Sequence, residues 1–167
     1  DMTCSSNSYV SNEGRDPVMQ RKRLLGIARA YLPEGGVNAA DPSVSPILGA
    51  PLNFLGLPPT LVQVGSAEVL VDESLEFQRL GRAVDADVSV QQYDGVLHAW
   101  HTFFPLMPKA AHALEQAAAF FCKHLGIKAP KGGPAVMSAT DAELEAAAVK
   151  LQSMQRGRLA RSKPKAP

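Results

Sequence analysis

Three side chains within residues 60–104 have the types and spacing needed for proton-transfer chemistry. Glu68 and Asp72 follow one apolar, β-branched segment, and His98 follows the next such segment, 30 and 26 residues later. Functional side chains of open α/β sheets gather beyond the carboxyl ends of the strands, so these groups should share one sheet edge. A histidine that moves a proton and a carboxylate that orients it are two of the three groups of a nucleophilic hydrolase triad.

The third group of such a triad, the nucleophile, has no counterpart in this sequence. No Gly-x-Ser-x-Gly, the turn that exposes a serine nucleophile, occurs in the 167 residues. The first residue is Asp1 rather than methionine, and two strands alone do not make a stable parallel sheet. We therefore expect a fragment of a longer protein, with the nucleophile and the oxyanion loop upstream.

The sequence leaves the identity of the triad acid open. Glu68 falls in the loop that follows the first strand, whereas Asp72 falls where a helix begins. An acid in the first turn of a helix is also explained as a cap or as a partner of the helix dipole. Glu68 is therefore the favoured acid and Asp72 the alternative.

The elements that must position these groups form a βαβ unit. Residues 60–64 and 88–93 have the short apolar pattern of strands buried in a parallel sheet. Residues 71–84 have the apolar spacing of a crossover helix. Another helix is expected from Pro108 to Gly126, because proline suits the first helical position and glycine the C-cap.

The region before this unit is predicted to hold one helix between two loops. Residues 1–15 are polar and predict loop. Asp16 can cap a helix that starts with Pro17 and runs to Leu32. Residues 37–59 contain five prolines and predict irregular structure.

Four segments together resemble the hormone-sensitive-lipase-like carboxylesterases, a branch of the α/β hydrolases (fold-3). GLPPTLVQVGSAEVLVDES at 56–74 and YDGVLHAWHTFF at 93–104 resemble the carboxy-terminal part of that family. DPVMQRKRLLGIARAYL and DPSVSPILGAPLNFLGLPP resemble its segment after the nucleophile. The resemblance covers residues 1 to about 125. It implies an α/β fold class, the carboxy-terminal half of an α/β hydrolase with parallel strands and crossover helices.

The resemblance also implies roles for individual residues. His98 takes the position of the catalytic histidine, followed by Ala99-Trp100 where the family usually has Gly-Phe, and Glu68 takes that of the acid, usually Asp. Asp85 stands where glycine is usual, a left-handed position that aspartate tolerates. The implied activity is that of a serine carboxylesterase or lipase acting on a small-molecule ester, with no cofactor and no metal.

The carboxy-terminal part has the pattern of a separate module. Residues 126–139 are rich in proline and glycine and predict a linker. Thr140 and Glu143 form a capping box, which predicts a separate C-terminal α-helix over 140–162, followed by a basic tail at 163–167. Six of the 17 basic residues, and no acidic residue, lie in the last 18 positions.

This predicted helix resembles an IQ motif. Its defined positions are Leu151, Gln152, Arg156, Gly157 and Arg161. The resemblance implies binding to calmodulin or a related EF-hand protein, with the apolar face in the partner's groove. Nucleic acid is a weaker interpretation of the same charge, because no aromatic stacking platform accompanies it. An inactive, hydrolase-derived calmodulin-binding adaptor is the alternative to an esterase.

The composition is that of a globular domain without a membrane span or a cysteine-based metal site. Hydrophobic residues make up 46% and charged residues 20%, as in ordinary globular domains. No run approaches the roughly 18 apolar residues of a membrane span. Cys4 and Cys122 have neither metal-type nor C-x-x-C spacing, so reduced thiols and a cytoplasmic location are expected.

Overall fold

A βαβ unit forms the centre of the fold. The computed structural model describes residues 1–32 and 36–128, and in this part β1 (Thr60–Gly65) and β2 (Val88–Tyr93) form a two-stranded parallel sheet. Helix α3 (Val71–Arg82) makes the crossover between them. The predicted strands and crossover helix are confirmed, with β1 one residue longer and α3 two residues shorter than expected.

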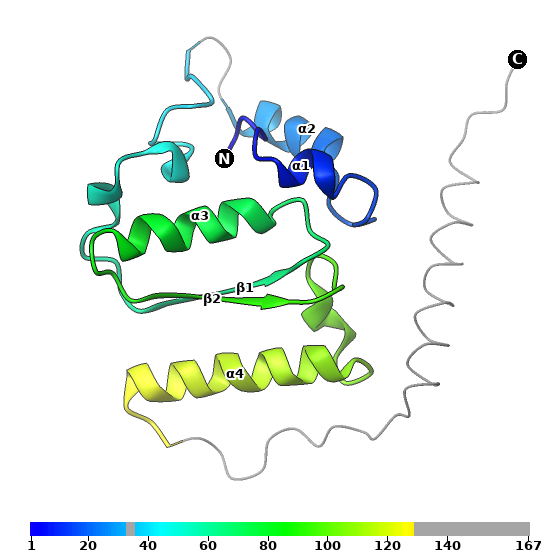
Figure 1. Cartoon of the computed structure of the whole chain (residues 1–167), viewed down its shortest axis with the longest axis vertical. Coiled ribbons are helices and arrows are strands. Elements are labelled where there is room, and N and C mark those ends of the chain that lie inside the picture. Colours follow the sequence, from blue (N-terminus) through cyan, green and yellow to red (C-terminus); the bar gives the residue numbers. More distant parts are fainter. Residues whose placement is uncertain (33–35, 129–167) are drawn as a thin grey trace, which may run out of the picture.

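Helices cover both faces of this sheet. Figure 1 shows α3 on one face and α4 (Pro108–Leu125) on the other, with the carboxyl ends of β1 and β2 at the same edge. Gly126 takes a left-handed conformation, with φ of 67°, and ends α4 as predicted. The predicted α/β fold class is confirmed for this part of the chain.

Charge and close packing explain why α3 occupies its place on the sheet. Asp72 and Glu73 lie in its first turn and Arg79 in its last, so the charges complement the helix dipole. A Cβ added at Gly81 would lie 2.6 Å from a methyl carbon of Val88. The absence of a side chain at Gly81 therefore allows the helix to approach β2 closely.

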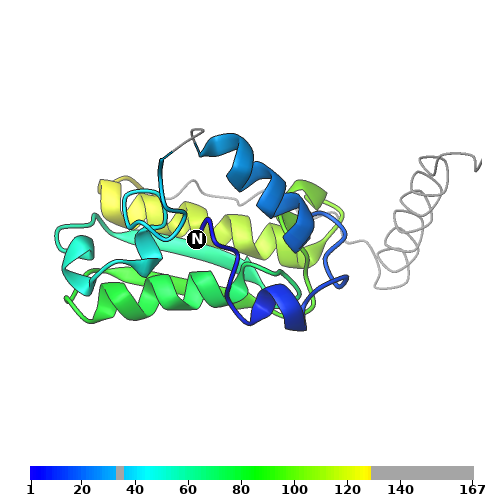
Figure 2. The ribbon, with the colours of Figure 1, turned by 90° about the horizontal axis from the view of Figure 1, so that it is seen from above.

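The segment before β1 differs from the prediction in two places. A short helix, α1 (Ser8–Ser11), lies in the stretch predicted as loop. Helix α2 runs from Arg21 to Tyr31 and is preceded by Gln20, so the prediction that it begins at Asp16-Pro17 was wrong. The Asp16 side chain instead closes a turn that precedes α2. Figures 1 and 2 show α1 beside the amino-terminal end of α3.

Single-turn 3-10 helices interrupt the loops. Two of them, Pro46–Leu48 and Pro51–Phe54, lie in the proline-rich region predicted as irregular. A third, Trp100–Phe103, follows directly after His98 and Ala99. This third turn carries the chain from the sheet edge toward α4.

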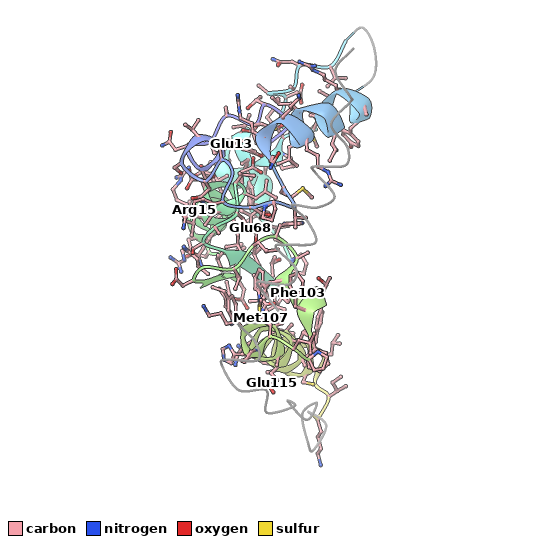
Figure 3. The ribbon with its side chains drawn as sticks, turned by 90° about the vertical axis from the view of Figure 1, so that its right-hand side faces the viewer. Glu13, Arg15, Glu68, Phe103, Met107 and Glu115 are labelled. Carbon is pink, nitrogen blue, oxygen red and sulfur yellow. The ribbon has the colours of Figure 1, made fainter. Side chains whose placement is uncertain are left out.

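The core under the sheet edge is built around an indole ring. Trp100 is 1% exposed and packs with Val96, Ala110 and Ala113. Figure 3 shows Phe103 and Met107, which pack against this cluster, between the sheet and α4. The loop that contains His98 is therefore anchored on a rigid, buried group.

Most of the predicted carboxy-terminal module lies outside the described residues. This applies to the linker beyond residue 128, the helix over 140–162 and the basic tail. Within the described ranges, no helix combines the length and the apolar character needed to cross a bilayer.

Candidate active site

Glu68 is buried in the turn that joins β1 to α3. Its side chain is 4% exposed, and its own N–H donates to the Gly65 carbonyl at 3.1 Å. One carboxylate oxygen, Oε1, accepts the backbone N–H of Gly65 at 2.6 Å. This contact fixes the carboxylate through Oε1 and leaves the second oxygen, Oε2, available for another partner.

Glu68 Oε2 lies 2.7 Å from Nδ1 of His98. A carboxylate only accepts hydrogen bonds, so Nδ1 carries the proton and Nε2 has a free lone pair when the ring is neutral. The His98 side chain is 32% exposed, and none of the described residues makes a hydrogen bond to its Nε2. A buried carboxylate thus orients an imidazole that presents a proton acceptor to solvent.

The two loops that carry this pair are joined by their backbones. Ser66 N–H donates to the Tyr93 carbonyl at 2.8 Å, and Ala67 N–H to the Val96 carbonyl at 3.4 Å. A Cβ added at Gly65 would lie 2.2 Å from the Val96 carbonyl oxygen. The end of β1 therefore approaches the histidine loop more closely than any side chain allows.

Asp72, the alternative acid, is placed differently. Asp72 lies in the first turn of α3, and its Oδ2 accepts a hydrogen bond from the backbone N–H of Ser8 at 2.7 Å. The structure brings His98 together with Glu68 and gives Asp72 a partner in α1. The geometry thus favours Glu68 for the role that the sequence left open.

His101 lies beside the pair of Glu68 and His98, but its contacts indicate a role in packing and hydrogen bonding within the fold. Its Nε2 is 2.9 Å from Gln63 Oε1, whose amide donates to Gln91 and to the Ala113 carbonyl. The ring also stacks on Trp100, with centroids 4.0 Å apart. Desolvation by burial lowers the pKa of His101, while the charges of Glu68 and His98 raise and lower it respectively.

We expect this lowered pKa to make stability sensitive to acid. The folded state favours neutral His101, so its contribution is complete above the ordinary pKa of 6.5 and is lost as the pH falls below that value, where the unfolded chain binds the proton more readily. His101→Gln, whose amide can still donate to Gln63, should flatten the decrease in the free energy of unfolding between pH 7 and pH 5. Urea titrations across this range, with exposed His112→Gln as the matched control, measure the effect. Parallel pH profiles for His101→Gln and the wild type would contradict it.

An open pocket lies apart from the acid–histidine pair. It has a volume of about 420 Å³ and is lined by residues of the first two helices and their connection, including Tyr9, Glu13, Arg21 and Arg29. Neither Glu68 nor His98 lines it. In the described ranges no cluster of three His, Cys, Asp or Glu side chains is placed to hold a metal ion.

Two buried polar side chains support the pair and were not assigned to it from sequence. Asn12 Nδ2 donates to the carbonyls of Ser66 and Glu68, at 3.0 and 2.8 Å. Asp16 Oδ2 accepts the backbone N–H of His98 at 2.7 Å. The sequence signal at Asp16 was the Asp-Pro dipeptide, which predicted a helix cap. The predicted calmodulin-binding residues (Leu151, Gln152, Arg156, Gly157 and Arg161) lie outside the described residues.

Comparison with known sequences gives one family match and two relatives. The family, described as alpha/beta hydrolase fold, matches residues 1–102. An acetyl-hydrolase of Streptomyces hygroscopicus is 31% identical over 120 residues, and an esterase of Acinetobacter venetianus is 34% identical over 120 residues. Each alignment covers 72% of this chain and 38% of the relative. The chain thus spans about two fifths of the length of these relatives.

Solved structures of similar fold match a similar share of this chain and of their own chains. An esterase from the bacterial hormone-sensitive lipase (HSL) family superposes with a TM-score of 0.68 at 34% identity, covering 75% of this chain and 41% of that one. The esterase EstE5, from a crystal soaked in p-nitrophenyl butyrate, gives a TM-score of 0.67 at 31% identity, covering 75% and 40%.

Proposed function

The chain belongs to the alpha/beta hydrolase fold family, and we propose that the protein containing it is a carboxylic ester hydrolase of the hormone-sensitive-lipase-like branch. In the experiments below, the whole protein is the full translation product that contains these 167 residues. The observation that supports the proposal is the 2.7 Å contact between Glu68 Oε2 and His98 Nδ1 at the carboxyl edge of the sheet. This is the orientation that a triad histidine needs.

In the proposed mechanism, His98 transfers one proton in each half of the reaction. Its Nε2 takes the proton of the serine hydroxyl while the serine oxygen bonds to the ester carbonyl carbon. Glu68 stabilises the resulting imidazolium, which returns the proton to the alcohol oxygen as the carbon–oxygen bond breaks. Water then repeats the sequence on the acyl-enzyme and releases the acid. This sequence contains no Gly-x-Ser-x-Gly, and the proposal therefore assigns the serine and the oxyanion donors to other parts of the whole protein.

The test is ester turnover by the whole protein. We expect it to hydrolyse p-nitrophenyl acetate or butyrate and to be labelled by a fluorophosphonate at the serine. His98→Ala should remove turnover and slow labelling, because the serine loses its base. A folded whole protein that turns over neither ester and resists labelling would contradict the proposal and leave the inactive adaptor as the better interpretation.

We further propose that the carboxy-terminal segment binds calmodulin or a related EF-hand protein. The support is the sequence motif: Leu151 belongs to its apolar face, and Arg156 and Arg161 supply positive charge for an acidic rim. Gln152 can bridge to backbone groups of the partner, and Gly157 allows the partner to approach closely.

The segment's binding can be separated from ester turnover. Leu151→Ala with Arg156→Ala should weaken binding to immobilised calmodulin by about 30-fold or more, the effect of losing an interface hot spot of about 2 kcal/mol. Lys163→Ala, a charge lost outside the motif, is the matched control, and His98→Ala should bind normally. Equal affinity of the double variant and the Lys163 variant would exclude a motif-specific partner.

A further inference from the structure

One loop contacts both halves of the acid–histidine pair. Residues 12–16 follow α1, and this short stretch carries the two buried side chains Asn12 and Asp16, which are 5% and 0% exposed. Asn12 lies against the loop of Glu68, and Asp16 lies against the loop of His98. Arg15, labelled with Glu68 in Figure 3, is linked to the loop of Glu68 through Asn12.

Asn12 fixes the backbone of the acid loop. Its amide nitrogen donates to the Ser66 carbonyl at 3.0 Å and to the Glu68 carbonyl at 2.8 Å. Its oxygen accepts from Arg15 Nη1 at 2.8 Å, which sets the orientation of the amide. Both amide protons thus bind carbonyl groups of the turn that carries Glu68.

Asp16 fixes the backbone of the histidine itself. Oδ2 accepts the His98 N–H at 2.7 Å, and Oδ1 accepts the N–H groups of Val18 and Met19 at 2.8 and 3.2 Å. The first contact joins residues 82 positions apart. The residue after His98, Ala99, has a left-handed φ of 59°, an uncommon conformation for a residue with a side chain. The Asp16 contact holds the chain at the point where it enters this conformation.

We propose that Asn12 and Asp16 are positioning residues that set the distance between Glu68 and His98. Both side chains are buried, and each contacts the backbone that carries a member of the pair. The role rests on the proposed ester hydrolysis, since it has a consequence for turnover only if the pair is catalytic. Its structural part, the restraint of His98 by Asp16, can be measured without turnover.

Asp16→Asn is the informative variant. The single oxygen of asparagine can keep the turn to Val18 and Met19, but its NH₂ group then faces the His98 N–H, two donors against each other. Asp41→Asn is the matched control, because Asp41 makes the same kind of turn, to Ser43 N–H at 2.8 Å, on the exposed surface. If Asp16→Asn does not fold, Asp16→Ser replaces it; a serine hydroxyl can keep a local turn but is too short to reach His98.

The experiment combines kinetics and NMR on the whole protein. We expect Asp16→Asn to lower kcat for p-nitrophenyl butyrate by roughly 10- to 100-fold, as a small misplacement of a catalytic group does, with little change in KM. The His98 amide should exchange faster with solvent, and the resonance of the Nδ1 proton should shift. Asp41→Asn should leave all three unchanged. Asn12→Leu should reproduce the loss of kcat, with exposed Asn53→Leu as its control.

The outcomes separate this inference from the proposed function. A folded Asp16→Asn protein with wild-type kcat and wild-type His98 exchange would overturn the positioning role. A variant that only melts earlier, with unchanged kcat in its folded fraction, would overturn it as well. If the wild type hydrolyses no ester, the proposed function fails, and the exchange and Nδ1 signals alone decide whether Asp16 restrains His98.

Discussion

Replacing Glu68 by glutamine in the whole protein should lower kcat for ester hydrolysis about 10⁴-fold, the loss known when a triad carboxylate becomes an amide and the histidine takes the wrong tautomer. The expected cause is specific to this site. Gly65 N–H and His98 Nδ1 both use carboxylate oxygens of Glu68, at 2.6 and 2.7 Å. Glutamine offers only one oxygen.

The conflict should be resolved at the histidine. A backbone N–H cannot give up its proton, so the glutamine oxygen stays with Gly65 and the NH₂ group faces Nδ1 of His98. Nδ1 must then accept, which moves the ring proton to Nε2 and removes the lone pair that would activate the serine. Nitrogen-15 chemical shifts of His98 should report this change of tautomer directly, alongside the kinetics.

Asp72→Asn is the matched control for this substitution. Its carboxylate accepts from Ser8 N–H rather than from His98, and an asparagine oxygen can still accept there. We expect its kcat to remain within about tenfold of the wild type, an effect below that of losing a general base. The reverse result, with a large loss for Asp72→Asn and a small one for Glu68→Gln, would assign the acid to Asp72.

Gly65→Ala should cost both stability and activity. The added methyl would lie 2.2 Å from the carbonyl oxygen and 2.8 Å from the carbonyl carbon of Val96. Both are backbone atoms, so the histidine loop must move as a unit. Overpacking of this kind costs about 1–3 kcal/mol in the free energy of unfolding, and the displacement of His98 should lower kcat as well. Urea unfolding and steady-state kinetics on the same samples measure the two effects.

Gly26→Ala should have the opposite effect on the free energy of unfolding. Gly26 lies inside α2, is exposed, and has nothing within 4 Å of a built Cβ. Alanine there should stabilise the helix by roughly 0.5–1 kcal/mol with no change in kcat. Equal stability of the two variants would show that the chain relaxes around residue 65 and that the close approach to Val96 is not required.

The central unit could be predicted because its signals are local. Alternation of apolar segments and the positions of Pro108 and Gly126 placed the two strands, the crossover helix and α4 to within two residues. Asp85 takes the left-handed conformation expected of it, with φ of 54°. The choice between Glu68 and Asp72 could not be made from local signals. It depends on which carboxylate the turn after β1 directs toward His98, which is 30 residues away from Glu68 in the sequence.

The segment before β1 was harder to predict for a related reason. An aspartate that accepts from the N–H groups two and three residues later has the same sequence signature in a helix cap and in an isolated turn. The contact that distinguishes them is Asp16 to His98 N–H, 82 residues away. Helix α1 has only four residues, and tertiary contacts hold it in place, including Ser8 Oγ to the Val69 carbonyl at 2.6 Å.

The short span of the chain that holds the acid, the base and their two supports has a consequence for recombination. All four lie between Asn12 and His98. Under the proposed function, a crossover anywhere before Asn12 would exchange the upstream part of the protein while keeping Asn12, Asp16, Glu68 and His98 together. A laboratory shuffle of related genes with breakpoints placed there should therefore yield active hybrids more often than one with breakpoints inside the interval.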